Sequence, residues 1–277
     1  MTVSSLLQLI RPRVSLAVAC GSLFGVLYHG GSHWMIGAMT ALGAGVLCAG
    51  CSVLNQVQER RFDSRMARTM DRPMAAGRVT VATGVWISLT LIFFGLLLFF
   101  RAGGWSLFGL GLAVPIIYNG LYTPLKPVTP MALLVGALSG ALPPLTGWVG
   151  AGGSMLDPTI LGVTTIFFLW QVPHFWLLHE KHRADYERAG FATLESRLPR
   201  TLYKPLLCLW ISAYFLGLGC LVVADGAGAV HWLAPPAIMF LGGWALFFVV
   251  RGFRRGAAAA VYASLPLTLV VLLTNTL

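Results

Sequence analysis

Three side chains that carry oxygen atoms, Asn55, Glu59 and Asp63, stand four residues apart in the sequence. On a helix, a step of four residues rotates the side chain by only about 40°, so all three would line one face. Arg68 and Arg72 repeat the same spacing immediately downstream. Carboxylate and amide oxygens are ligands that Mg²⁺ prefers, and guanidinium groups bind phosphate oxygens in pairs. The segment therefore has the side chains needed to bind a diphosphate together with its metal ion.

A helix must carry these side chains if their spacing is to matter. We expect this helix to continue from the apolar run before Asn55 into the polar segment and to end at Pro73, which cannot continue it. A second interpretation stays open, in which the segment is a solvated loop. Ion pairs between neighbouring helical turns, such as Asp71 with Arg68, would then account for the charges.

A second polar segment, HFWLLHEKHRADYERAG, follows a later apolar run. His174 and, eleven positions later, Asp185 would fall on one face of a continuous helix. An ionisable side chain within a membrane span is a functional candidate, because burying it there is costly. The alternative for His174 is a packing role, in which it is hydrogen-bonded to a neighbouring helix.

The stretch YNGLYTPLKPVTP lies between these two segments and contains Tyr118, Tyr122 and Lys126. The face of an aromatic ring attracts positive charge, so the two tyrosines could face a cation that develops during a reaction. Without further information they are equally typical of the aromatic belt at a membrane surface, and Lys126 of a short cytoplasmic loop.

The elements that position these residues must be membrane helices. Of the 277 residues 57% are hydrophobic and only 10% are charged, with a mean hydropathy of +0.79, values typical of proteins that cross a membrane many times. A helix needs roughly 20 apolar residues to cross the bilayer. Nine runs meet this requirement, at about 14–30, 35–55, 81–101, 105–121, 131–150, 159–178, 203–224, 229–250 and 257–275. The predicted fold is therefore all-α.

Positive charge is distributed unevenly over the connections between these runs. Eighteen of the 19 Lys and Arg residues fall on one side of the membrane, and only Arg101 lies on the other. The positive-inside rule makes the basic side cytoplasmic, so the N-terminus would be inside the cell and the C-terminus outside. A net charge of +10 then reflects topology, and nucleic acid is excluded as a partner because the basic residues sit in short loops between spans.

Four stretches together resemble a known family. NQVQERRFDSRMARTMDRP is similar to the first signature of the UbiA superfamily of intramembrane prenyltransferases, and in particular to its heme O synthase branch. YTPLKPVTP, GALPPLTGW and the pair WQVPHFW and DYERAG resemble further segments of that branch. The resemblance runs from the N-terminus to at least Gly190.

This resemblance implies a single membrane domain over residues 1–277, with about nine helices around a central cavity. It also implies transfer of a farnesyl group from farnesyl diphosphate to a vinyl group of heme B, with Mg²⁺ as cofactor. The setting would be the lipid bilayer of the cell (inner) membrane, with the active-site loops in the cytoplasm and a downstream heme A synthase as partner. The metal ligands implied are Asn55, Glu59, Asp63 and Asp185. The catalytic residues implied are Asp63, Asp185 and His174. The substrate-binding residues implied are Asn55, Arg68, Arg72, Lys126, Tyr118 and Tyr122.

The chain departs from the pattern of this branch at a few positions. Glu59 and Arg61 stand where the branch has aspartates, and Pro127 stands where it has an arginine. Two other functions therefore stay open. One is a related prenyltransferase acting on an aromatic or quinone-precursor acceptor, and the other is a membrane transporter whose polar groups bind an ion or an anionic solute.

Overall fold

Helices form all of the regular structure in residues 2–30, 34–226 and 229–274, which are the residues that the computed structural model describes. The all-α prediction is confirmed. In chain order the helices are α1 (Val3–Ile10), α2 (Pro12–His29), α3 (Trp34–Asp63), α4 (Val81–Pro115), the π-helix η1 (Ile116–Tyr122), α5 (Thr123–Leu125), α6 (Ala132–Gly150), α7 (Pro158–Lys181), α8 (Arg183–Ala189), α9 (Leu194–Arg197), α10 (Arg200–Asp225), α11 (Ala229–Arg251) and α12 (Arg254–Leu273).

Within the described ranges, seven helices are long and apolar enough to cross a membrane, and α1 with α2, bent by 45°, adds an eighth span. One of the seven, the stretch Val81–Leu125, has 45 residues. A straight helix of that length would measure about 67 Å, far more than the roughly 30 Å of a bilayer core. This stretch must therefore cross more than once.

Two glycines divide the long stretch into two helices. Gly103 and Gly104 have non-helical backbone angles, and the φ of 59° at Gly104 lies in the left-handed region that glycine adopts without strain. Beyond the break the chain folds back. This is shown by the closeness of Gly111 to Phe99: a Cβ atom at Gly111 would lie 2.5 Å from the ring of Phe99. In a straight helix these two residues would be about 18 Å apart. Counting the two halves separately gives, for the described residues, a number of spans close to the nine predicted, and residue 275 of the ninth predicted run lies outside the described residues.

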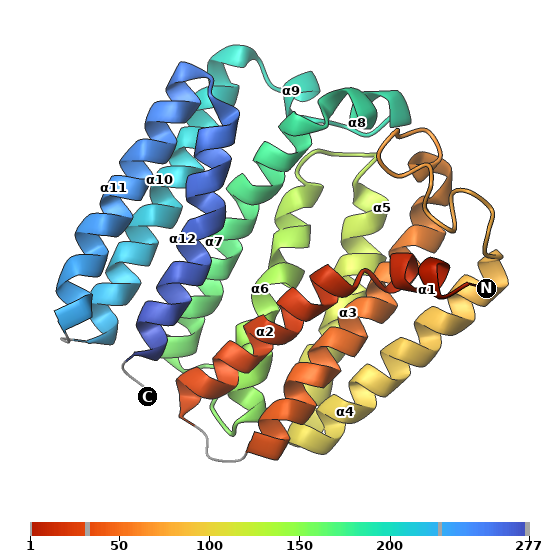
Figure 1. The fold of residues 1–277 in the computed structure, drawn as a ribbon, viewed down its shortest axis with the longest axis horizontal. Coiled ribbons are helices and arrows are strands. Elements are labelled where there is room, and N and C mark those ends of the chain that lie inside the picture. Colours follow the sequence, from red (N-terminus) through yellow and green to blue (C-terminus); the bar gives the residue numbers. More distant parts are fainter. Residues whose placement is uncertain (1, 31–33, 227–228, 275–277) are drawn as a thin grey trace.

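The helices form one bundle in which α6 and α7 occupy the middle. Figure 1 shows α2, α3 and α4 on one side of this pair and α10, α11 and α12 on the other. Helix α6 packs against α2 and α7, and α7 packs in turn against α10 and α12.

Small residues allow the backbones of α2 and α6 to touch. A Cβ atom at Gly147 would lie 1.8 Å from the carbonyl oxygen of Ser22, and one at Gly25 would lie 2.0 Å from that of Pro144. Contacts this close are typical of membrane helices, where association depends on van der Waals packing. They fix the position of α6 relative to the helices that carry the site.

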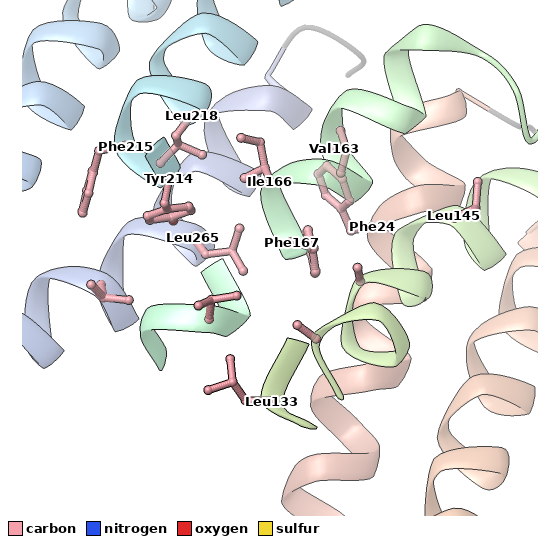
Figure 2. Close-up of a cluster of buried hydrophobic side chains, with 14 of the residues drawn as sticks. Phe24, Leu133, Leu145, Val163, Ile166, Phe167, Tyr214, Phe215, Leu218 and Leu265 are labelled. Atoms are coloured by element: carbon pink, nitrogen blue, oxygen red, sulfur yellow. The ribbon is translucent and has the colours of Figure 1, made fainter. Parts of the chain in front are cut away.

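A core of aliphatic and aromatic side chains joins the two sides of the bundle. Figure 2 shows part of this core, and the residues labelled there include Phe24 of α2, Leu145 of α6, Phe167 of α7, Tyr214 of α10 and Leu265 of α12. The hydroxyl of Tyr214, which is fully buried, lies 2.8 Å from that of Ser264. The outer faces expose other large apolar side chains, as expected for helices in contact with lipid.

Candidate active site

Helix α3 ends in the row of polar side chains that the spacing predicted. Asn55, Glu59 and Asp63 are 2%, 7% and 3% exposed, so all three are buried in the protein rather than directed into water. A buried carboxylate is stable only with a charged or hydrogen-bonding partner. The identity of these partners decides what the row can bind.

The helix ends ten residues earlier than predicted. Helix α3 stops at Asp63, and residues 64–79 form a series of turns, so the expectation of a helix as far as Pro73 was wrong. The carbonyl of Asp63 accepts hydrogen bonds from Met66 N and from the hydroxyl of Thr69, which closes the helix end. The turn also buries Met66, 2% exposed, against Ala189 and Phe191.

These turns bring Arg72 back to Asp63. The Nη1 atom of Arg72 donates to both carboxylate oxygens of Asp63, at 2.9 Å each. The Asp63 side chain is 4% exposed and that of Arg72 is 19% exposed, which makes this a largely buried ion pair. A carboxylate and a guanidinium group therefore share the mouth of the site.

Glu59 has a partner that is distant in the sequence. Lys126 Nζ, just after α5, donates to Glu59 Oε1 at 2.7 Å and lies 4.4 Å from the ring centre of Tyr122. Burial lowers the pKa of Lys126 and is the largest single effect, but the Glu59 carboxylate together with Tyr118 and Tyr186 raises it by more and leaves that pKa above its ordinary value. Lys126 is therefore charged at neutral pH and faces both a carboxylate and an aromatic ring.

The π-helix η1 places Tyr118 and Tyr122 side by side, with ring centres 5.4 Å apart. Asn55 Nδ2 donates to the hydroxyl of Thr123 at 3.1 Å, which connects the row on α3 to the end of η1. The structure thus brings Asn55, Tyr118, Tyr122 and Lys126 to one region, although 63 residues separate Asn55 from Tyr118 in sequence.

Three residues of this region were missed by the sequence analysis as members of the site: Gln58, Asn119 and Thr123. Gln58 Nε2 donates to the carbonyl of Asn119 at 2.9 Å, and Asn119 Nδ2 donates back to Gln58 Oε1 at 3.1 Å. Pro124 was the available signal, because a proline has no N–H group and leaves a preceding helical carbonyl without its donor.

Asp185 lies apart from the row on α3, against the turns that follow it. Helix α7 ends at Lys181, and Asp185 belongs to the separate short helix α8, so the expected continuous helix with His174 and Asp185 on one face was wrong. Asp185 Oδ1 accepts from the backbone N–H of Ala67 at 3.2 Å and lies 3.5 Å from a guanidinium nitrogen of Arg188. In this position Asp185 holds residues 64–71 against α8.

Arg68 is exposed on the same turns and faces the end of α7. Burial lowers the pKa of His182, and the charges of Arg68 and Lys181 lower it further. Arg68 therefore adds positive charge to the side of the mouth formed by α7 and α8.

His174 lies within α7 among aromatic rings. Its imidazole stacks on Trp170 with ring centres 4.5 Å apart, and the ring of Tyr262 from α12 lies 4.8 Å away. Among the described residues, no group forms a hydrogen bond with its Nδ1 atom. The alternative of a packing histidine that is hydrogen-bonded to a neighbouring helix stays a prediction.

Arg61, which stands where an aspartate was expected, makes no ion pair with any described residue. It lines a cavity of about 430 Å³ together with Gln58, Arg60, Phe62 and Arg65. The three arginines make this part of the surface strongly basic.

The donor set suits a magnesium ion bound together with phosphate. In the described part of the chain, no three His, Cys, Asp or Glu side chains gather closely enough to hold a metal by themselves. The set of Asn55, Glu59 and Asp63 offers one amide and two carboxylates, which are oxygen ligands only. Mg²⁺ is commonly held by one or two carboxylates and completed by substrate phosphates, so these residues fit it.

Known proteins resemble this chain over most of its length. The model of the UbiA prenyltransferase family matches residues 15–273. A protoheme IX farnesyltransferase of Oleidesulfovibrio alaskensis is 38% identical over 97% of this chain and 96% of its own length. One of Geobacter sulfurreducens is 43% identical over 75% of this chain and 76% of its own length.

Solved structures share the fold at low sequence identity. A digeranylgeranylglyceryl phosphate synthase structure superposes with a TM-score of 0.78 at 12% identity, over 99% of this chain and 98% of that chain. A UbiA homologue from Archaeoglobus fulgidus, bound to GPP and Mg²⁺, superposes with a TM-score of 0.67 at 13% identity, over 95% and 99%. These likenesses concern the arrangement of the helices.

Proposed function

The chain belongs to the UbiA prenyltransferase family, and from this premise we propose that it transfers a farnesyl group from farnesyl diphosphate to a vinyl group of heme B, forming heme O. The observation that carries the proposal is the 38% identity to a protoheme IX farnesyltransferase along 97% of the chain. Family membership removes the reason for considering a transporter. The protein is an integral membrane protein, and we place it in the cell (inner) membrane with its N-terminus and active-site loops in the cytoplasm and its C-terminus outside.

In this proposal the polar end of α3 binds the head of the prenyl diphosphate. Asn55, Glu59 and Asp63 would hold Mg²⁺, and Asp185, which lies apart from this row, would hold the turns of residues 64–71 against α8. The metal ion, when bound, neutralises negative charge on the departing diphosphate. Support comes from the burial of the three side chains on α3 and from their all-oxygen chemistry.

The cations around this row bind the phosphate oxygens. Arg72 and Lys126 are already present as partners of Asp63 and Glu59, and Arg68 lies exposed at the mouth. With the carboxylates bound to a metal ion, the guanidinium group of Arg72 and the ammonium group of Lys126 would be available to the diphosphate. Charges placed where negative charge develops lower the barrier to breaking the carbon–oxygen bond.

The two tyrosines of η1 face the allylic carbon in this arrangement. The ammonium of Lys126 already lies 4.4 Å from the Tyr122 ring centre, so positive charge is stabilised beside this ring. Tyr118 extends the aromatic surface, and the surrounding apolar helices exclude the water that would quench a carbocation.

We assign His174 to the acceptor. It lies between the rings of Trp170 and Tyr262 within the membrane region and keeps an unbonded Nδ1 among the described residues. An imidazole in these surroundings can contact heme B or move a proton during the addition of water that completes the hydroxyethylfarnesyl group. The product would then pass to a heme A synthase.

The test is a reconstitution with defined substrates. Protein purified in detergent is mixed with heme B, farnesyl diphosphate and Mg²⁺, and the heme is followed by chromatography and mass spectrometry. A mass gain of one farnesyl group plus one hydroxyl group, the net result of farnesyl transfer and addition of water with release of a proton, supports the proposal, and chelation of the metal should abolish it. Asp63→Asn is the inactive variant, and Asp71→Asn, in the exposed part of the same turns, is its matched control.

Diphosphate release with an aromatic acceptor, but without a heme product, would contradict heme B as the substrate. The diphosphate site would then stand, and the departures at Glu59, Arg61 and Pro127 would belong to a prenyltransferase for aromatic or quinone-precursor acceptors. If Asp63→Asn kept both diphosphate release and formation of the heme product, the role given to the row on α3 would be contradicted.

A further inference from the structure

The π-helix η1 leaves one backbone carbonyl without a helical donor. In a π-helix each N–H group binds the carbonyl five residues earlier, and Thr123 N accordingly donates to the carbonyl of Tyr118. In this register the carbonyl of Asn119 would need a donor at position 124, which is Pro124 and has no N–H group. Gln58 Nε2 supplies the missing donor at 2.9 Å.

Asn119 then attaches η1 to α3 on both sides of Asn55. Its Nδ2 atom donates to the carbonyl of Cys51 and to Gln58 Oε1, at 3.1 Å each. Cys51 lies four residues before Asn55 and Gln58 lies three residues after it, so the two attachment points are on the same side of α3 as Asn55. These side-chain contacts hold η1, and with it Thr123, close to Asn55.

The hydroxyl of Thr123 carries a single proton. The acceptor to which it donates this proton determines the orientation of the Asn55 side-chain amide. Thr123 Oγ1 donates this proton to the carbonyl of Tyr118 at 2.9 Å. Towards Asn55 it can then only accept, and it accepts from Asn55 Nδ2 at 3.1 Å. The reverse orientation of the amide would bring two acceptors together and lose this bond.

The other end of the amide is left available. Asn55 Oδ1 accepts no hydrogen bond from any residue in the described ranges, although the residue is only 2% exposed. From these contacts we infer that Thr123 is a positioning residue, which turns the oxygen of Asn55 towards the metal ion bound with the diphosphate. The inference rests on the proposed function, because it concerns the same metal ion.

The experiment measures metal binding without turnover. Mn²⁺ replaces Mg²⁺ so that binding to the purified full-length chain can be followed by electron paramagnetic resonance, with inorganic diphosphate as the second ligand. Thr123→Val keeps the shape of the side chain and removes the hydroxyl. We expect it to weaken Mn²⁺ binding by about 10-fold to 100-fold, the usual effect of losing a group that orients a metal ligand.

Two controls separate orientation from packing. Thr123→Ser keeps the hydroxyl and should bind Mn²⁺ as the unmodified protein does. Thr129→Val makes the same substitution on a threonine whose Oγ1 accepts only from Met131 N, and it should also leave binding unchanged. Should Thr123→Val fail to fold, as judged by size exclusion in detergent, Thr123→Ala takes its place.

A change at Asn55 itself gives a sharper test. In Asn55→Asp both terminal atoms of the side chain are oxygens, so its orientation no longer matters. Adding Thr123→Val to this variant should therefore weaken Mn²⁺ binding no further. An equal loss in both backgrounds would overturn the inference, because it would mean that the hydroxyl acts in some other way.

Other results also decide the matter. Unchanged Mn²⁺ binding in Thr123→Val, with loss in Asp63→Asn, would overturn the inference and leave the proposed function in place. Equal losses in Thr123→Val and Thr123→Ser would overturn it too, since the serine keeps the hydroxyl. Unchanged binding in Asp63→Asn would contradict the metal site itself, and with it the proposed function.

Discussion

Removal of the Lys126 ammonium tests whether the Glu59 carboxylate can bind a metal ion in place of Lys126. Lys126→Met keeps a similar apolar stem and leaves the Glu59 carboxylate, with a side chain 9% exposed, without its charged partner. The two atoms are 2.7 Å apart, so their attraction is about 6 kcal/mol at an effective dielectric constant of about 20. Desolvation of both groups offsets part of this attraction.

The net loss follows from the burial of the pair. Breaking a buried ion pair by removing one partner costs about 3–5 kcal/mol, and the 18% exposure of the Lys126 side chain places the expected loss near 3 kcal/mol. For a protein of this size, a loss of about 3 kcal/mol lowers the melting temperature by about 6–12 °C. Glu59→Gln combined with Lys126→Met removes both charges and should melt closer to the unmodified protein.

Thermal unfolding in detergent, followed by the fraction that remains monodisperse on size exclusion, measures these differences. Because a divalent cation can replace the missing ammonium, Mg²⁺ should stabilise Lys126→Met more than it stabilises the double variant. Lys204→Met, which removes an exposed lysine at the start of α10, should change neither the melting temperature nor the response to Mg²⁺.

Two results would refute this reasoning. If Lys126→Met melted at the unmodified temperature, the ion pair would contribute no more than an exposed one does. If Mg²⁺ stabilised Lys126→Met and the double variant equally, the Glu59 carboxylate would not accept a metal ion.

Three further changes give distinct outcomes. Asp63→Asn should slow diphosphate release by about 100-fold, whereas Asp71→Asn should not, as measured with a coupled phosphate assay. Arg72→Gln should raise the KM for farnesyl diphosphate more than it lowers kcat, because it removes a positive charge that contacts the bound diphosphate. A larger effect on kcat than on KM in steady-state kinetics would count against this role. Gly147→Ala should destabilise the protein by about 1–3 kcal/mol, because its Cβ would lie 1.8 Å from a backbone oxygen of α2. Gly109→Ala, with nothing within 4 Å, should be neutral or slightly stabilising in the same unfolding assay.

The course of the chain through the membrane was predictable from local properties. Apolar run length depends only on composition, and the runs 81–101 and 105–121 correctly predicted the division of α4. The alignment of Asn55, Glu59 and Asp63 along one helix followed from their spacing. Each of these features is determined by residues close together in sequence.

The remaining features depend on contacts between distant segments. Pro73 set only a limit on the length of α3, and the helix ends at Asp63 because the turns that follow bury Met66 and return Arg72 to Asp63. Sequence spacing cannot predict which cation will reach a given carboxylate. The pairing of Glu59 with Lys126 across 67 residues is of this kind.

The same limit applies to the orientation of Asn55. The row of Asn55, Glu59 and Asp63 was recognised from the sequence. Which terminal atom of Asn55 points away from Thr123 depends on where the Thr123 hydroxyl donates its proton, and this depends on the hydrogen-bond register of η1. Each hydrogen bond of a π-helix spans one residue more than in an α-helix. In the sequence, only Pro124 gives an indirect indication of this π-helix.

The break at Gly103 and Gly104 also decides on which side of the membrane the rest of the chain emerges. Each crossing reverses the side, so the parity of the crossings before Lys126 determines whether it shares a compartment with Glu59. A single uninterrupted span in place of the two halves of α4 would put the lysine across the bilayer from the carboxylate, together with an inverted arrangement of every later helix. The turn at Gly103 and Gly104 is therefore required for Lys126 to lie on the same side of the membrane as Glu59.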